Sequence, residues 1–301
     1  MVAAVAAVAC GPTPTIDTPA YPETGLVLLS LTDGTLRASA PVGSDVVAVI
    51  VSNDGKTAYL ADSAPGDVYA IKLPELRTVW KHHVGGAPFG LLLHSGRLFV
   101  SLFTGGLVVE LDTTDGAQLA THAVHDGPAV MAIAPDGRVA VAGTGGQVDY
   151  LDGTSTPAGN GFAVAVVRGR VWTADYKRGQ LVPVGNDRSV GLPLPVFPFW
   201  LAPGSGDALL VAAEGATEDT DPGAVLSFDT TTGAFSTLAT PKDPDQVLQS
   251  GSTIFVAAHG ERDVLAIHDG RPTAWARGAA AVALAPDPAF GYLVVAVNAH
   301  E

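Results

Sequence analysis

The sequence predicts an all-β fold, a seven-bladed β-propeller of four-stranded antiparallel blades in which N-terminal strands complete the last blade. Three observations favour this fold. The 35 glycines and 22 prolines lie between short apolar runs rich in Val, Ala and Leu, which is typical of many short strands joined by tight turns. A four-strand unit recurs along the chain, and no segment has a sustained helical period. A half unit at each end of the chain supplies what the other lacks.

Each unit begins with an apolar strand. These first strands are expected to start near Val46, Phe89, Val130, Phe162, Trp200, Gln246 and Ala281. The starts lie 32 to 46 residues apart, which is the spacing of propeller blades. Tight turns such as "NDG" (53–55) and "PDG" (135–137) follow, because a short hairpin needs the positive φ that Gly adopts without steric cost.

A second and a third strand complete the core of each unit. The second strands read "TAYLAD", "RLFVSL", "RVAVAG", "RVWTAD", "ALLVAAE", "TIFVAAH" and "YLVVAVN". After a Gly-bearing loop, the third strands read "GDVYAIKL", "GLVVELD", "GQVDYLD", "GQLVPV", "GAVLSFD" and "RDVLAIHD". Asp112, Asp152, Asp229 and Asp269 follow third strands and are interpreted as turn formers that lead into a fourth strand. In the third unit, "GTSTPAGNG" leaves little room for that fourth strand.

The last unit stops after two strands, at residues 281–301. Residues 25–43, "GLVLLSLTDGTLRASAPVG", read as a third strand, a turn and a fourth strand with nothing before them. Together the two halves make a seventh blade in a two-plus-two arrangement. Such a closure pairs the two ends of the chain and removes the open sheet edge between the first and last blades.

Three stretches resemble the repeats of seven-bladed YVTN propellers and, more distantly, pyrroloquinoline-quinone-type repeats. They are "VVAVIVSNDGKTAYLADSAPGDVYAIKL" (46–73), "VVELDTTDGAQLATHAV" (108–124) and "VMAIAPDGRVAVAGTGGQVDYLD" (130–152). The resemblance covers residues 25–301 and implies the fold. It says little about chemistry, because propellers carry many unrelated activities.

The composition excludes some functions. The formal net charge is −14, from 30 acidic and 16 basic residues, so binding to nucleic acid is not expected, since that requires a basic surface. A single cysteine excludes an internal disulfide framework and any multi-cysteine zinc site. No cofactor is predicted, and the protein is expected to be a monomer.

The N-terminus, "VAAVAAVACGPTPTIDTPAYPETG", resembles the processing site of a bacterial lipoprotein, in which small residues precede a cysteine that becomes lipidated. Residues 1–10 would be a truncated signal, residues 11–23 a flexible Pro/Thr-rich tether and residues 24–301 a single propeller domain. Ala7 and the lack of a preceding Lys or Arg depart from the pattern, and a chance cysteine in an apolar N-terminus is the alternative. Lipidation of Cys10 would place the protein outside the cytoplasm, in the periplasm or cell envelope, and would be its only link to a membrane.

In a propeller, the ends of the second strands and the starts of the first strands lie on the same face. They surround the mouth of the central channel. The residues at second-strand ends are Asp62, Ser101, Gly143, Asp175, Glu214, His259 and Asn298. Those at first-strand starts are Asp45, Phe89, Asp126, Phe199, Trp200 and Asp245. This ring has three interpretations: polar loop residues at a wet mouth, a binding site for a small polar ligand, peptide or protein, or a site for a hard cation such as Ca²⁺.

The weak candidates for such a cation site are Glu214, Glu218, Asp219 and Asp221 in the loop "AEGATEDTDPGA" (213–224). The loop lacks the ligand order of an EF-hand. Senescence-marker/gluconolactonase propellers hold a metal with acidic and Asn ligands, but no residue-by-residue match to their motif is made, and their activity is not carried over.

The favoured function is therefore a binding or scaffold module that recognises a protein, peptide or small ligand at the channel mouth. The alternative is a cation-dependent, lactonase-like hydrolase or lyase. A third candidate is a helper subunit of a redox enzyme, because related propellers occur beside quinone and copper enzymes.

Overall fold

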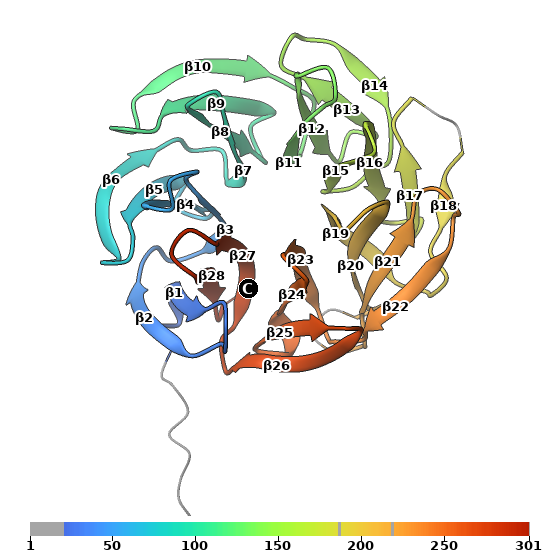
Figure 1. The fold of residues 1–301 in the computed structure, drawn as a ribbon. Helices are drawn as coiled ribbons and strands as arrows, with labels where there is room; N and C mark the ends of the chain where they lie inside the picture. The colour runs from blue at the N-terminus through green and yellow to red at the C-terminus, as the bar shows by residue number, and fades with distance from the viewer. Residues whose placement is uncertain (1–20, 186–187, 218–219, 301) are drawn as a thin grey trace, which may run out of the picture.

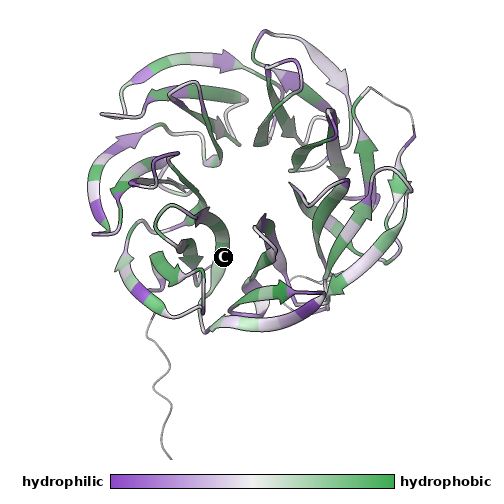
Figure 2. Ribbon diagram, viewed as in Figure 1, coloured by the Kyte–Doolittle hydropathy of each residue, from purple (hydrophilic) through white to green (hydrophobic). Residues whose placement is uncertain are grey.

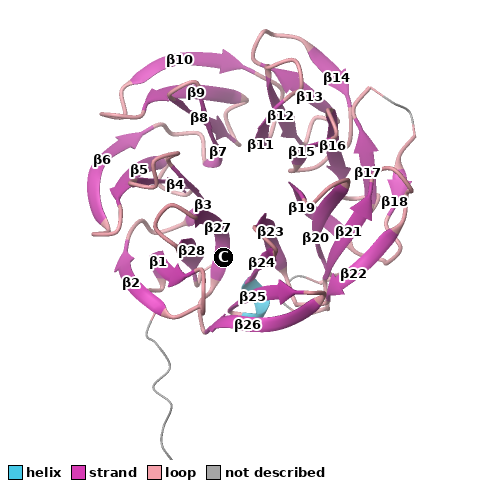
Figure 3. Ribbon diagram, in the orientation of Figure 1, coloured by secondary structure: helices cyan, strands magenta, loops and turns pink. Residues whose placement is uncertain are grey.

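The structure is a computed structural model that describes residues 21–185, 188–217 and 220–300. Within these ranges, seven four-stranded antiparallel sheets form the blades of a ring around a central channel (Figure 1). Figure 3 shows that the described chain is almost entirely strand and loop, with one short 3₁₀ helix, η1 (His259–Glu261). The predicted seven-bladed propeller is confirmed. Cys10 and the expected signal over residues 1–10 lie outside the described residues, as does most of the tether.

Blades 1 to 4 follow one another along the chain, each running from its inner to its outer strand. Blade 1 consists of β3 (Val46–Val51), β4 (Thr57–Asp62), β5 (Asp67–Lys72) and β6 (Arg77–His83). Blade 2 consists of β7 (Pro88–His94), β8 (Arg97–Leu102), β9 (Leu107–Asp112) and β10 (Gln118–Ala123). Blade 3 consists of β11 (Pro128–Ile133), β12 (Val139–Gly143), β13 (Gln147–Tyr150) and β14 (Ser155–Pro157). Blade 4 consists of β15 (Val164–Val167), β16 (Arg170–Asp175), β17 (Gln180–Pro183) and β18 (Val190–Gly191).

Blades 5 and 6 continue this order, and blade 7 joins the two ends of the chain. Blade 5 consists of β19 (Phe197–Pro203), β20 (Ala208–Glu214), β21 (Ala224–Asp229) and β22 (Phe235–Ala239). Blade 6 consists of β23 (Pro244–Ser250), β24 (Thr253–Ala258), β25 (Asp263–His268) and β26 (Arg271–Arg277). Blade 7 consists of β27 (Ala281–Asp287) and β28 (Tyr292–Asn298), followed by β1 (Thr24–Ser30) and β2 (Leu36–Pro41).

Blade 7 therefore contains two strands from the C-terminal end of the chain and two from the N-terminal end, as predicted. β1 pairs with β28 along its whole length, from Thr24 opposite Asn298 to Ser30 opposite Tyr292. The apolar residues 26–29 of β1 and 293–297 of β28 are each 0% exposed. The ring is thus closed by a ladder of backbone hydrogen bonds rather than by a loose contact between the ends.

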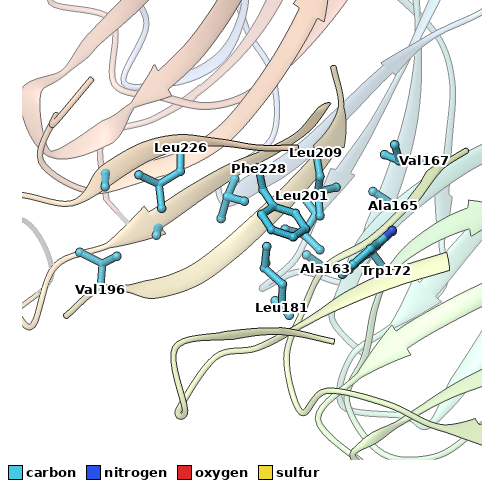
Figure 4. Close-up of a cluster of buried hydrophobic side chains, with 14 residues drawn as sticks. Ala163, Ala165, Val167, Trp172, Leu181, Val196, Leu201, Leu209, Leu226 and Phe228 are labelled. Atoms are coloured by element: carbon cyan, nitrogen blue, oxygen red, sulfur yellow. The ribbon is translucent and has the colours of Figure 1, made fainter. Parts of the chain in front are cut away.

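The hydrophobic core lies between neighbouring blades. The described residues form seven buried apolar clusters, and each joins side chains from two adjacent blades. Figure 4 shows the cluster between blades 4 and 5, where Trp172 packs edge-on against Phe228. Figure 2 shows that inner strands are largely apolar, whereas outer strands such as β6 and β10 carry polar residues. Trp80, Trp172 and Trp275 each pack in one of these clusters between blades.

Six of the seven inner strands contain a β-bulge close to their start, and β15 pairs regularly. A bulge bends a strand and re-aims a side chain. In β7 the bulge includes Gly90, and a Cβ at this position would lie 2.1 Å from the carbonyl oxygen of Ala129 in blade 3. The Ser101 hydroxyl accepts a hydrogen bond from the Gly90 amide and donates one to the same Ala129 oxygen. Neighbouring inner strands therefore approach backbone to backbone.

The turns confirm the structural interpretation of the recurring aspartates. The Asp112 carboxylate accepts the Thr114 amide at 2.7 Å, and this hydrogen bond lowers the pKa of Asp112. Asp152 and Asp229 accept backbone amides in the same way. Asp269 instead adopts a φ of 47° in the hairpin between β25 and β26. Little room was predicted for a fourth strand in blade 3, and the fourth strand there, β14, has only three residues. The fourth strand of blade 4, β18, has two.

Candidate binding site at the channel mouth

The predicted ring of polar residues lies on one face of the propeller. Because each blade is an antiparallel meander, second-strand ends and first-strand starts meet on this face, which we call the mouth face. Asp62, Asp175, Glu214 and Asn298 end their second strands, and His259 begins η1 directly after β24. All five side chains are buried, with exposed fractions between 0 and 7%. Their hydrogen bonds therefore decide what the ring can do.

On blades 6, 7 and 1 these residues form one hydrogen-bonded chain, which we call the polar network. The Asn298 side-chain amide donates to Asp45 Oδ1 at 3.0 Å. The Asn298 backbone oxygen lies 2.9 Å from His259 Nε2, and His259 Nδ1 lies 3.3 Å from Asp243 Oδ2. The polar network thus crosses both interfaces of blade 7, with blade 6 and with blade 1. A buried polar chain whose members satisfy one another stabilises and fixes a single arrangement.

Two aspartates extend the polar network into the loops of blade 1. The Asp62 carboxylate accepts the backbone amides of Asp45 at 2.7 Å and Ser44 at 3.1 Å. Asp45 Oδ2 accepts the amide of Ala64 at 2.9 Å. These carboxylates hold the start of β3 against the loop that follows β4. They serve loop structure and do not point together at a common ligand position.

The carboxylates of blades 4 and 5 also have partners. Asp175 accepts the backbone amide of Arg178 and forms an ion pair with its guanidinium group at 2.9 Å. Glu214 accepts a hydrogen bond from the hydroxyl of Tyr176. Asp126 is exposed at the start of blade 3, and Asp245 is partly exposed in the bulge of β23. These bonded ring candidates thus form two separate groups, one on blades 6, 7 and 1 and one on blades 4 and 5.

No metal centre is formed by the described residues, in which no group of three or more His, Cys, Asp or Glu side chains could hold an ion. In the loop over residues 213–224, Glu218 and Asp219 lie outside the described residues, and Glu214 is turned to Tyr176. The Asp221 amide donates to the Thr217 oxygen at 3.0 Å, so the described part of this loop folds back on itself. A cation held by this loop stays a prediction.

The opposite half of the mouth carries an aromatic cluster, which we define as Phe89, Phe103, Phe162, Tyr176, Phe197 and Phe199. All six side chains are partly exposed. Phe162 lies at its centre, with ring-centroid distances of 5.2 Å to Phe199, 5.7 Å to Tyr176, 6.0 Å to Phe103 and 6.1 Å to Phe89. The rings come from blades 2, 4 and 5. Blade 3 has glycines on this face, Gly143 at the end of β12 and Gly127 just before β11, and rings of blades 2 and 4 contact each other directly.

Beneath the mouth, the channel contains an apolar cavity of about 280 Å³. Inner strands of six blades line it with residues such as Val49, Leu91, Met131, Trp200 and Leu284. The polar side chain in the lining is Gln246, whose Oε1 accepts the backbone amide of Leu284. Small-molecule sites are usually concave and apolar with few polar groups. Phe89 and Phe199 lie directly before the cavity residues Gly90 and Trp200, which joins the aromatic cluster to the channel.

The repeat pattern predicted Phe89, Phe199 and Trp200 as site residues, but it did not predict Phe103, Phe162, Tyr176 or Phe197 as such. The available signal was the pair Pro-Phe, at residues 88–89 and 198–199, where the bulge turns a ring toward the mouth. Phe103 and Tyr176 directly follow second strands. An aromatic residue just after a second strand was therefore a second signal.

The fold and the mouth define the chain as a seven-bladed β-propeller. Its sequence matches no family model, and no curated protein is similar enough in sequence to count as a relative. A streptogramin B lyase structure is similar, with a TM-score of 0.72 and 14% identity over 91% of this chain and 95% of that one. An inactive variant of virginiamycin B lyase from Staphylococcus aureus, with quinupristin, has a TM-score of 0.70 and 12% identity over 91% of this chain and 99% of that one. BamB from Moraxella catarrhalis has a TM-score of 0.55 and 18% identity over 95% of each chain. At these identities the likeness shows the fold alone.

Proposed function

We propose that this protein is a binding module whose mouth face recognises a protein, a peptide or a small ligand. The observation that supports this proposal is the aromatic cluster above the apolar cavity. Partly exposed aromatic rings are characteristic of binding surfaces, because they offer a large contact area with few rotatable bonds. The buried carboxylates of the mouth contact their own loops and neighbours, which favours a structural role for them over a catalytic one.

Site-specific photo-crosslinking tests this proposal. A photoreactive p-benzoylphenylalanine is placed at Phe103, in the aromatic cluster, or at Phe290, which is 50% exposed in the turn between β27 and β28 on the opposite face. We expect a discrete adduct from the Phe103 position in intact cells, identified by mass. The adduct should decrease when excess protein without the photoreactive residue competes.

A matched variant makes the result specific. The substitution Phe162→Ala removes the ring that contacts four others and should abolish the adduct at Phe103, while far-ultraviolet circular dichroism confirms that the blades remain folded. Equal adduct yields at Phe103 and Phe290, or a yield unaffected by Phe162→Ala, would show that the aromatic cluster is not the binding surface.

We further propose that the protein is an extracytoplasmic lipoprotein anchored through Cys10. The motif around Cys10 supports this. In the described residues, no helix is long and apolar enough to cross a membrane. Intact mass of protein extracted from membranes tests the anchor, since a mature N-terminus other than a lipidated Cys10 would exclude it.

A lyase or hydrolase activity at the mouth is the second candidate, because two lyases share this fold. It requires a cation held by carboxylates and Asn298, for which Ca²⁺ is suited. Thermal unfolding with and without calcium tests the ion, and lactone hydrolysis and streptogramin B cleavage test the chemistry. An unchanged Tm in millimolar calcium, together with no turnover, would remove this candidate.

A further inference from the structure

A pocket of about 200 Å³ lies between blades 4 and 5 on the face opposite the mouth. Val167, Arg168, Arg170 and Trp172 of blade 4 and Thr230 and Thr231 of blade 5 line it. Arg168 lies in the turn between β15 and β16, and the two threonines lie in the turn after β21. This pocket is separate from the channel cavity and from the mouth.

At the same position between blades 1 and 2, two aromatic side chains donate hydrogen bonds to one carbonyl oxygen. Tyr59 is the third residue of the second strand β4, and its hydroxyl donates to the backbone oxygen of Thr113 at 3.3 Å. Trp80, from the outer strand β6, donates its Nε1 hydrogen to the same oxygen at 3.2 Å. Between blades 6 and 7, Trp275 of the outer strand β26 donates in a similar way to the Ser30 oxygen at 3.2 Å. A carbonyl of the next blade thus satisfies the polar atom of each of these aromatic side chains.

Blade 4 departs from this pattern. Trp172 occupies the third position of β16, which corresponds to Tyr59 in β4. The outer strand β18 spans two residues, Val190 and Gly191, so it carries no counterpart of Trp80. Within the described residues, Trp172 Nε1 has no hydrogen-bond partner, although the side chain is only 4% exposed. Figure 4 shows this nitrogen at the edge of the apolar cluster, away from Phe228 and on the side of Val167. A buried indole N–H without a partner costs stability.

The other polar groups of the pocket are two arginines and two threonines. Arg168 binds the Asp207 carboxylate and, at 2.8 Å, the Thr231 hydroxyl, so its charge is compensated. The Thr231 and Thr230 hydroxyls donate to the Asp207 carboxylate and backbone oxygen, each at 2.9 Å. Arg170 is exposed and forms no ion pair with any residue that the structure describes. Arginine and tryptophan side chains have donors and no acceptors, so the pocket is chemically suited to a ligand rich in acceptors.

We propose that this pocket binds a small oxyanion, a carboxylate, phosphate or sulfate group, with the Arg170 guanidinium and Trp172 Nε1 as its free donors. Arg168, held by Asp207 and Thr231, forms the adjacent wall. Guanidinium groups match the geometry of such anions. Since the whole chain carries a formal charge of −14, general electrostatic attraction does not favour anions, and binding must come from these local donors. The site is independent of the binding function proposed for the mouth.

Nuclear magnetic resonance of ¹⁵N-labelled protein tests this inference, because each of the four tryptophans gives its own indole N–H signal. The Trp172 signal is assigned by its loss in Trp172→Phe. On titration with sodium phosphate, that signal should shift and saturate, while those of Trp80, Trp200 and Trp275 stay in place. Acetate and sulfate titrations then rank the anions, and sodium chloride at equal ionic strength is the salt control.

Two arginine variants separate the site from surface effects. Arg170→Gln should abolish the saturable shift while the Trp172 signal itself confirms the fold. Arg37→Gln, which removes an exposed arginine from β2 in blade 7, should leave the shift intact. A Trp172 signal that none of the three oxyanions moves, a shift that sodium chloride reproduces, or a shift that survives in Arg170→Gln would overturn the proposal.

Discussion

Removal of the last strand tests the closure of the ring directly. A chain that ends after Pro288 lacks β28, which pairs with β27 on one side and β1 on the other. In β28, Leu293, Val294, Val295 and Val297 are each 0% exposed. Full burial of a Val or Leu side chain contributes roughly 1.5–3 kcal/mol, so these four account for about 6–12 kcal/mol as an upper estimate. A folded domain has a net stability of only about 5–15 kcal/mol.

We therefore expect the truncated chain to have no cooperative unfolding transition, measured by circular dichroism in urea and by calorimetry. The matched control ends after Asn298. It keeps β28 and loses the hydrogen bond from the Ala299 amide to the Glu23 oxygen at 2.7 Å, which costs about 1 kcal/mol. If the chain ending at Pro288 unfolds cooperatively with a midpoint near that of the control, the ladder between β1 and β28 does not hold the ring together, and the closure argument is wrong.

Three further substitutions have defined outcomes. Burial, and to a smaller extent the charge of Asp54, raises the pKa of Asp287, so the stability that this group provides at acid pH is lost as the pH rises through its folded-state pKa. Asp287→Asn should stabilise the protein at pH 7 by about 1 kcal/mol, with a gain that shrinks toward pH 3 in urea unfolding; a constant gain would point to another cause. Asn298→Asp places a second carboxylate beside Asp45 and should cost about 2–3 kcal/mol at pH 7 and less at pH 3, whereas pH-independent stability would contradict the polar network. Gly90→Ala drives a Cβ into the Ala129 oxygen and should lower stability by several kcal/mol. Gly96→Ala should cost less, because its Cβ meets no atom within 4 Å and its cost comes only from the strain of a positive φ of 75°.

The architecture could be predicted because its signals are local and repeated. Hairpin turns such as the one at Asp269 and Gly270 reveal themselves in a few residues, and their spacing gives the number of blades. The closure followed from two half units that each lacked what the other supplied. The short β18 escaped prediction, since a strand of two residues leaves no pattern of its own.

The mouth could be predicted only in part. Second-strand ends such as Asp62 and Asn298 were found because their place in the repeat fixes the face they occupy. Their partners were not, since the contact between Asn298 and Asp45 joins residues 253 positions apart in sequence. Phe162 was predicted as a strand start. Its role in the aromatic cluster depends on aromatic side chains of blades 2 and 5, which reach Phe162 only when the blades are assembled.

The pairing of Thr24 with Asn298 also fixes where the chain leaves the propeller. β1 begins on the mouth face, so the segment before it departs from the rim that surrounds the candidate binding surface. If Cys10 is lipidated, residues 11–23 span at most about 45 Å when fully extended. An anchored propeller would then keep the rim of its mouth within about 45 Å of the bilayer. Ligands released from, or delivered to, the membrane surface would reach the mouth over a shorter path than those in free solution.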